Sequence, residues 1–255
     1  DVGYVIGSVK SLQDVRVGDT ITHVKGGASE PIPGYQEAKP MVFSGIFPTQ
    51  SEDFEDLRSA LEKLQLNDAS LTYEPETSKA LGFGFRAGFL GLLHMEIVQE
   101  RLDREFDIDI ITTVPNVQYE VLLEDKTKIR VDNPSQMPDV GDIDTIYEPY
   151  IKASIITPAE YIGPIMKLCQ ERRGVYVNQM FMQNNRVEIT YELPMAEVVF
   201  DFYDRLKSVT RGYASFDYQM DSYRSGDLVK VSILVNGDPV DALAMIVHRE
   251  QAEYR

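Results

Sequence analysis

The sequence has 255 residues, 43% of them hydrophobic, which is enough for two or three domains with a core in each. Its 41 Asp and Glu outweigh 25 Lys and Arg, and the net charge of −16 excludes a general positively charged sheath for nucleic acid. No apolar run approaches the roughly 20 residues that cross a bilayer, so we expect a cytoplasmic location. The single cysteine, Cys169, excludes an intramolecular disulfide and is expected to be a buried thiol on a helix.

The two ends of the chain both interrupt strand-like patterns, so we expect a piece of a larger protein. Residues 2–9 and 20–25 read as short strands around a turn, and the polar, proline-containing segment after them reads as a linker. We therefore expect a domain boundary near residue 38.

Residues 39–115 predict a first unit of four strands and two helices. A strand at "MVFSGIFP" precedes a helix whose apolar stripe includes Leu57, Leu61 and Leu64. Two strands, "ASLTYEP" and "KALGFGF", are followed by a second amphipathic helix and by the strand "DIDIITTVP". The order β-α-β-β-α-β is that of the ferredoxin-like arrangement.

Residues 149–224 predict the same order again, after a β hairpin and connector at 116–148. The helix of "TPAEYIGPIMKLCQERRG" is expected to begin at a capping box, with Thr157 as the cap and Glu160 three residues later. One continuous helix is expected from Met195 to Leu206, and residues 225–255 are expected to begin a further β-rich unit. The predicted fold class is α+β, with two tandem ferredoxin-like domains.

The stretch "GFGFRAGFLGLLHMEIVQE" at residues 82–100 raises the question of a phosphate loop. A Walker-type loop needs a Gly-Lys pair, which the sequence lacks, and the glycine spacing differs from the dinucleotide fingerprint. We instead expect Gly82 and Gly84 to allow close backbone approach, and Gly88 and Gly91 to supply unusual dihedral angles at the turn. Arg86, beside an exposed helix N-terminus, remains a candidate for binding an RNA phosphate.

Catalytic and metal-binding sets are not evident in the sequence. His23, His94 and His248 lie far apart, with no second ligand at zinc-like spacing, and His94 is expected to be a packed or capping residue. We find no Ser-His-Asp or Cys-His set. We therefore predict no catalytic residue, no metal ligand and no cofactor for this chain.

Positive charge gathers in two places, each followed by a glycine at a helix end. One holds Arg172 and Arg173, and the other holds Arg205, Lys207 and Arg211. Compensation of the helix dipole explains such residues, and a local docking patch for RNA or protein is the alternative.

Several segments carry a resemblance to a known family. The stretches "LEKLQLNDASLTYEPETSKALGFGFRAGFLGLLHMEIVQERLDREF", "YELPMAEVVFDFYDRLKS" and "TRGYASFDY" closely resemble the elongation factor 4 (LepA) family of translational GTPases. "PAEYIGPIMKLCQERRG" and "RGYASFDY" resemble elongation factor G more distantly. Elongation factor G has an extra domain where this sequence has only a short connector, which favours the first family.

The resemblance implies a ribosome-dependent GTPase that acts on stalled or mistranslocated ribosomes. By analogy, residues 1–38 end a β-barrel second domain, residues 39–115 and 149–224 match the third and fifth domains, and residues 225–255 begin the C-terminal domain. The domain that binds GTP and Mg²⁺ in the family is not in this sequence. The implied partners are large-subunit rRNA, factor-binding ribosomal proteins and the GTP-binding domain, without DNA, and the parent is expected in the cytoplasm or peripherally at the inner face of the membrane.

The implied ribosome contacts, mapped by position, are the basic residues already singled out: Arg86, Arg172, Arg173, Arg205, Lys207 and Arg211. Two other readings stay open. The chain could be a regulatory module whose two units bind a small metabolite between them, or part of an elongation factor G. A closed, partly apolar pocket between the units would favour the metabolite.

Overall fold

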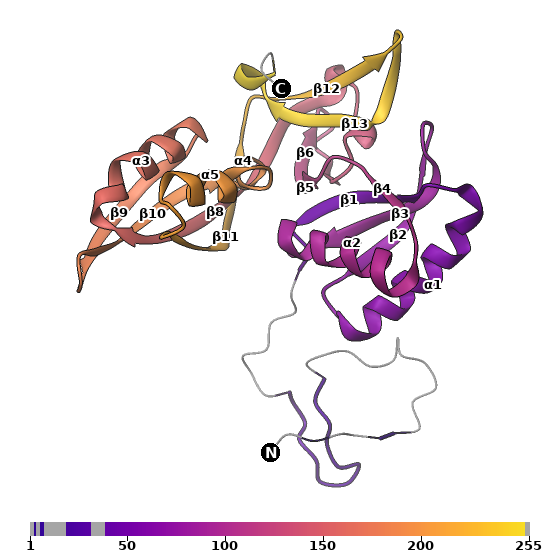
Figure 1. Cartoon of the computed structure of the whole chain (residues 1–255). Helices are drawn as coiled ribbons and strands as arrows, with labels where there is room; N and C mark the ends of the chain where they lie inside the picture. Colours follow the sequence, from indigo (N-terminus) through magenta and orange to yellow (C-terminus); the bar gives the residue numbers. More distant parts are fainter. Residues whose placement is uncertain (1–2, 4–5, 8–18, 32–38, 253–255) are drawn as a thin grey trace.

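The computed structural model describes residues 3, 6–7, 19–31 and 39–252 (Figure 1). Most of the predicted first strand, and residues 32–38 of the predicted linker, lie outside the described residues. The strand predicted at residues 20–25 does not form, because that segment has only coil and a turn around Val24.

The first unit runs from β1 (Val42–Pro48) through α1 (Phe54–Asn67), β2 (Thr72–Ser78), β3 (Gly82–Phe89) and α2 (Leu92–Phe106) to β4 (Ile110–Thr112). Its antiparallel sheet has the order β2-β3-β1-β4, and β5 (Asn116–Val117) also pairs with β1. Helices α1 and α2 lie against one face (Figure 1). Leu57, Leu61 and Leu64 are fully buried, so the apolar spacing predicted the core face of α1 correctly.

The second unit runs from β8 (Ile143–Pro158) through α3 (Ile162–Glu171), β9 (Val175–Met182), β10 (Arg186–Pro194), α4 (Met195–Val198) and α5 (Phe202–Val209) to β11 (Ser215–Ser225). Strand β8 lies in the middle and pairs antiparallel with β10 and with β11. The chain is thus an α+β protein with antiparallel sheets, and the predicted order of strands and helices is confirmed in both units.

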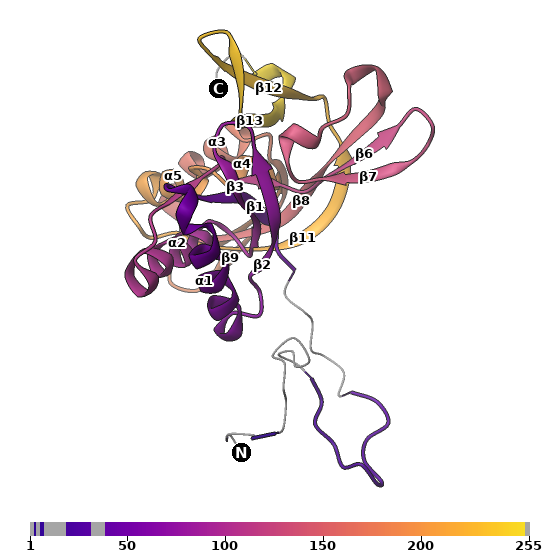
Figure 2. The ribbon, with the colours of Figure 1, turned by 90° about the vertical axis from the view of Figure 1, so that its right-hand side faces the viewer.

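The hairpin of β6 (Tyr119–Leu123) and β7 (Lys128–Val131) forms as predicted, but it is not a separate connector. Strand β8 is 16 residues long, and its first part pairs with β6. The hairpin therefore belongs to the sheet of the second unit, as Figure 2 shows.

Two predicted helix features are wrong. Thr157 caps no helix, because it lies within β8 opposite Val187, and α3 begins only at Ile162 after a short 3-10 turn (Ala159–Tyr161). The helix predicted from Met195 to Leu206 is broken between Val198 and Phe202.

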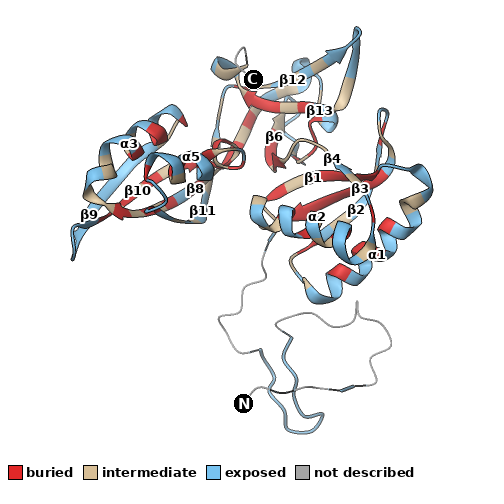
Figure 3. Cartoon of the chain, in the orientation of Figure 1, coloured by how far each residue is buried: buried red, intermediate tan, exposed pale blue. Residues whose placement is uncertain are grey.

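The last hairpin, β12 (Leu228–Val235) and β13 (Asp238–His248), packs where the two units meet (Figure 1). The Tyr119 hydroxyl donates a hydrogen bond to the Ile246 carbonyl (3.3 Å), and buried residues of both units and of this hairpin form one core cluster. Figure 3 shows burial along β1 and β3 and through the middle of the second unit, whereas β9 is exposed. None of the described helices has the length and apolar character needed to cross a membrane.

Candidate functional site

The glycines of residues 82–91 shape strand β3 and its connection to α2. Their individual roles differ in part from those predicted. Gly84 does allow close approach, since a Cβ there would lie 2.4 Å from the Ile46 carbonyl oxygen. Gly82 instead supplies the left-handed dihedral, with φ +81°, and Gly88 is a close approach, with a Cβ that would lie 2.6 Å from Thr72 Oγ1. Gly91 is extended at φ 177°, so the unusual dihedrals predicted for Gly88 and Gly91 are wrong.

Arg86 does not lie at an exposed helix N-terminus. It stands in the middle of β3, is 5% exposed, and directs its guanidinium toward Asp132, where Nη2 donates to the main-chain carbonyl and Nε lies 3.6 Å from Oδ1. A guanidinium enclosed in this way presents no charge to a phosphate in solution, so the predicted position of Arg86 is wrong.

Arg86 belongs instead to a polar junction, which we define as Glu76, Arg86, Asp132, Asn133 and Asp241; Arg86 and Asn133 are buried and the three carboxylates are half-buried. The Asn133 side-chain amide donates to Glu76, and Asp241 on β13 accepts hydrogen bonds from the Ser78 hydroxyl (2.8 Å) and the Lys79 N–H (2.9 Å). These contacts join the first sheet to the segment after β7 and to the last hairpin.

One carboxylate of the polar junction is only partly satisfied. Within the part of the chain that the structure describes, Glu76 Oε2 and Arg86 Nε are both buried without a hydrogen-bond partner. Both residues line a cavity of about 20 Å³, which has room for one water molecule. Burial raises the pKa of Glu76, against the opposing attraction of Arg86, while the charges of Asp132 and Asp241 raise it further.

His94 caps the turn into α2, as predicted. Its Nδ1 accepts the Leu90 N–H at 3.0 Å, so Nε2 carries the proton and donates to Asp68 Oδ2 at 2.6 Å. Asp68 ends α1, so the imidazole joins the ends of two helices. Burial alone would raise the pKa of Asp68, but hydrogen bonds from Ser70 and His94 outweigh burial and lower it.

Arg172 and Arg173 lie in a second set of charges, which we call the ion cluster: Glu148, Arg172, Arg173, Glu197 and Asp201. All of these side chains except Asp201, which is 47% exposed, are largely enclosed. Arg173 binds both oxygens of Glu148 at 2.8 Å, and its Nε lies 3.1 Å from Glu197 Oε1. Arg172 contacts Asp201 Oδ1 at 2.5 Å and Glu197 Oε2 at 3.8 Å. The two Glu side chains are 1% and 4% exposed, so the ion cluster neutralises the two arginines inside the protein.

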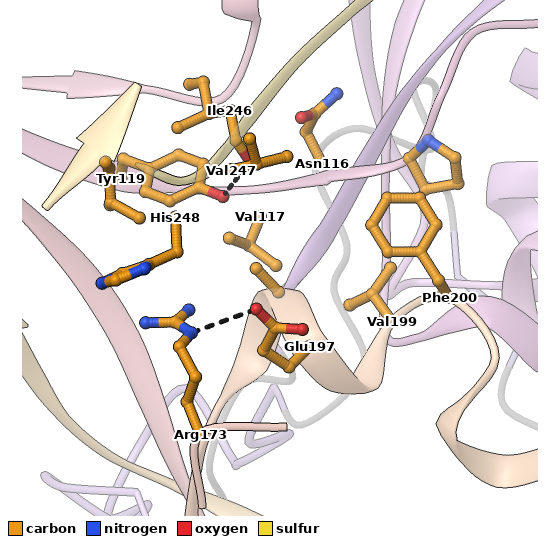
Figure 4. A pocket seen from close by; sticks show the side chains of 13 residues that line it. Asn116, Val117, Tyr119, Arg173, Glu197, Val199, Phe200, Ile246, Val247 and His248 are labelled. Atoms are coloured by element: carbon orange, nitrogen blue, oxygen red, sulfur yellow. Dashed lines mark hydrogen bonds and ion pairs between the residues drawn. The ribbon is translucent and has the colours of Figure 1, made fainter. Parts of the chain in front are cut away.

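The ion cluster borders the place where both units and the last hairpin meet (Figure 4). Figure 4 shows the Arg173 guanidinium between Glu197 of α4 and His248 of β13, below Tyr119. The cavity there is about 10 Å³, which is too small for any metabolite. Burial alone would lower the pKa of Arg173, but Glu148 and Glu197 outweigh it and raise the pKa above its ordinary value.

In the second predicted basic group, Arg205 and Arg211 are exposed and Lys207 is half-buried. Arg205 is 55% exposed and pairs with Asp201 at 3.0 Å, so Asp201 connects the two predicted basic groups. Lys207 donates to the Ala214 carbonyl at 2.6 Å and lies over the ring of Tyr203. Arg211 is exposed, and no ion pair to it is found among the described residues.

Sequence reasoning missed the carboxylates that hold the arginines. Glu148 lies in "IYEPYI" and Glu197 in "MAEVV", each a single charge among residues that become buried. A lone charge inside an apolar pattern is the signal that could have found them, since such a charge is almost never buried unless paired. Among the described residues, no group of three His, Cys, Asp or Glu side chains could hold a metal ion.

Two family models match most of the chain. Residues 38–114 match elongation factor G domain III, and residues 145–234 match the elongation factor G C-terminus. Two antiparallel α+β units match these two models in this order, so the chain contains domains of the elongation factor G type.

Comparison with individual relatives identifies the family within this class of proteins. Elongation factor 4 of Geobacillus thermodenitrificans is 57% identical over 255 residues, all of this chain and 42% of that protein. The proteins of the same name from Chlorobium limicola and Crocosphaera subtropica are each 59% identical, over 99% and 100% of this chain and 42% of theirs. The chain belongs to the elongation factor 4 family, and it spans about 42% of the length of the relatives it matches.

Proposed function

We propose that this chain is the ribosome-docking part of a translational GTPase that acts on stalled or mistranslocated ribosomes. The observation that carries the proposal is the identity of 57–59% to proteins named elongation factor 4 along the whole chain. In this proposal the partners are large-subunit rRNA, factor-binding ribosomal proteins and the GTP-binding domain of the parent. The location is the cytoplasm, with peripheral contact of the parent to the inner face of the membrane.

The contacts of the polar junction and of the ion cluster support a role in passing conformational change between the ribosome and the GTP-binding domain of the parent. The polar junction joins the first unit to the last hairpin, and the ion cluster joins α3, α4 and β8 next to the same hairpin. Buried polar networks of this kind favour one arrangement of the elements they connect, which suits a relay between a ribosome and a GTP-binding domain.

The finer domain assignment is part of this proposal. Residues 39–115 and 149–224 are two ferredoxin-like domains equivalent to the third and fifth domains of elongation factor G, and residues 116–148 hold the hairpin that extends the sheet of the second domain. Residues 1–38 end a β-barrel domain, and residues 225–255 begin a C-terminal domain. The strand orders β2-β3-β1-β4 and β9-β10-β8-β11 support the two ferredoxin-like domains.

For contact with rRNA, we propose Arg211, together with Arg205 and Lys207, rather than the three enclosed arginines. Replacing Arg211 with Glu should weaken co-sedimentation with purified ribosomes and reduce the slope of affinity against salt by about one. Arg104→Glu is the matched control, because Arg104 is 75% exposed on α2 of the first unit. Equal pelleting of the two variants across a salt series would refute the role of Arg211.

The proposed GTP chemistry belongs to the parent and not to these 255 residues, which contain no Gly-Lys pair. A calorimetric titration of the chain with GTP and Mg²⁺ should give no stoichiometric heat. A stoichiometric heat signal would contradict the proposal that GTP binds only to the GTP-binding domain of the parent.

The metabolite-binding alternative gains no support from the junction between the units. Its cavities of about 10 and 20 Å³ hold a water molecule, whereas a metabolite needs several hundred Å³.

A further inference from the structure

Strand β9 is an edge strand that is exposed along its whole length. It ends the strand order β7-β6-β8-β10-β9, and β10 is its only partner strand among residues 3, 6–7, 19–31 and 39–252. All eight of its residues, VYVNQMFM, are exposed, and six of them are large and hydrophobic. Phe181 is 66% exposed and Met180 is 56% exposed, on opposite faces of the strand.

The other edge strands of the two sheets are protected against pairing with another chain. Strand β4 has three residues and β5 has two, and the other three edges carry charges or proline: Glu74, Pro75 and Glu76 in β2, Lys128 and Arg130 in β7, and Asp217, Asp221 and Arg224 in β11. Such residues are the usual means of blocking an edge. Strand β9 has neither charge nor proline, and its irregular pairing is confined to the part opposite Thr190 and Tyr191.

The chemistry of this edge selects a polypeptide as its occupant. The free side of β9 presents main-chain N–H and C=O groups, and only another extended backbone offers the complementary row of hydrogen bonds. The strand has no Lys or Arg to bind phosphates, and the chain carries a net charge of −16, which disfavours RNA here. The apolar side chains on both faces fit an uncharged, apolar segment.

The start of β9 is held firmly, so the edge is presented by a rigid part of the fold. Tyr176 packs edge-on against the buried ring of Tyr191 at 5.6 Å between ring centroids. Gly174, just before the strand, lies so close to the end of α3 that a Cβ would be 2.7 Å from the Cys169 carbonyl oxygen. A preformed edge binds a partner strand without first paying the entropy of its own ordering.

We propose that β9 is a docking edge that pairs with an extended, uncharged and apolar segment of a partner protein. This inference rests on the proposed function in one respect, because it takes the partner to be a protein of the ribosome. The contact then differs in chemistry from the salt-dependent contact proposed for Arg211.

Two substitutions of one residue distinguish a protein partner from RNA. Phe181→Lys and Phe181→Glu in the whole chain should each weaken ribosome co-sedimentation about tenfold, since either charge opposes an apolar strand. Phe83→Lys and Phe83→Glu are matched controls, because Phe83 is 68% exposed but lies in β3, which is paired on both sides. They should bind as the unsubstituted chain does.

The other outcomes each overturn the proposal. If Lys strengthens binding while Glu weakens it, the edge faces RNA, and if neither changes binding, β9 is not a docking edge although the proposed function stands. If the unsubstituted chain does not pellet with ribosomes, the proposed function fails and the inference fails with it.

A photo-crosslinking amino acid at position 181 provides a second measurement that preserves the aromatic side chain. With ribosomes, p-benzoyl-phenylalanine at position 181 should attach to a ribosomal protein, and the same group at position 83 should not. Attachment to rRNA, or to a second copy of the chain alone, would contradict the proposal.

Discussion

Arg173 and Glu148 form a two-fold hydrogen-bonded ion pair, with Nη1–Oε1 and Nη2–Oε2 both at 2.8 Å. Arg173 follows α3 and has φ 57°, whereas Glu148 belongs to the central strand β8, with a side chain that is 1% exposed. The pair fixes the end of a helix to the strand that pairs with β6, β10 and β11. The charge of Glu148 is tolerated there only because Arg173 meets both of its oxygens.

Removal of the charge on Glu148 should therefore be costly. Glu148→Gln leaves Arg173 partly uncompensated in the interior, and we expect a loss of about 3 kcal/mol in the free energy of unfolding. Urea denaturation would measure it. Asp144→Asn is the control, because Asp144 pairs with the exposed Lys126, and it should cost no more than about 1 kcal/mol. Equal losses for the two variants would show that the Glu148 pair is not energetically distinct.

Glu76 should make the protein less stable as the pH rises. Because burial raises the pKa of Glu76 in the folded state, its ionisation is more costly there than in the unfolded chain. Below the ordinary value of 4.5 the carboxyl is protonated in both states and costs nothing. The stability of the native chain relative to Glu76→Gln should then fall as the pH rises from 4.5 through the raised pKa. Unfolding free energies of both proteins between pH 4 and 8 would test this, and a parallel pair of curves would contradict it.

Much of the fold could be predicted because its signals are local. The stripe of Leu57, Leu61 and Leu64 and the alternation along β10 indicate helix and strand without knowledge of distant residues. Thr157 shows the limit of local signals. The capping box was a sound helix start, but antiparallel pairing with β10 as far as Arg186 continues β8 through residue 158. Tertiary pairing overrode the local preference.

The candidate site was harder to predict, because the fate of each arginine depends on distant carboxylates. Arg173 meets Glu148 across 25 positions and Glu197 across 24 positions, and Arg86 meets Asp132 across 46. The sequence around Arg173 resembles the sequence around Arg211, because each arginine directly precedes a glycine at a helix end. In the structure both arginines also have positive φ. Only the packing of β8 and α4 encloses Arg173 and leaves Arg211 exposed.

The contact between His94 and Asp68 should stabilise the first unit at neutral pH. Asp68→Asn keeps an acceptor for Ser70 but loses the charge-assisted bond from His94, which we expect to cost about 1–2 kcal/mol. Since the folded-state pKa of Asp68 is lowered, this stabilisation is present above 3.8, its ordinary value, and is lost as the pH falls through the lowered pKa. Thermal unfolding of both proteins at pH 7 and in acid would measure the difference, which should shrink in acid.

Cys169 should be unreactive until the second unit opens. Its side chain is fully buried between α3 and the sheet, and burial raises the pKa of the thiol to about 12. At pH 8 the thiolate fraction is then roughly a thousandfold below that of an ordinary cysteine, and access to a reagent is blocked as well. Labelling with a thiol-specific disulfide reagent should be correspondingly slow in the native chain and rapid in denaturant.

Because Cys169 lies on the helix that ends at the ion cluster, Glu148→Gln should accelerate labelling, whereas Asp144→Asn should leave the rate unchanged. Acceleration by Asp144→Asn to the same degree would show that labelling does not report on the ion cluster.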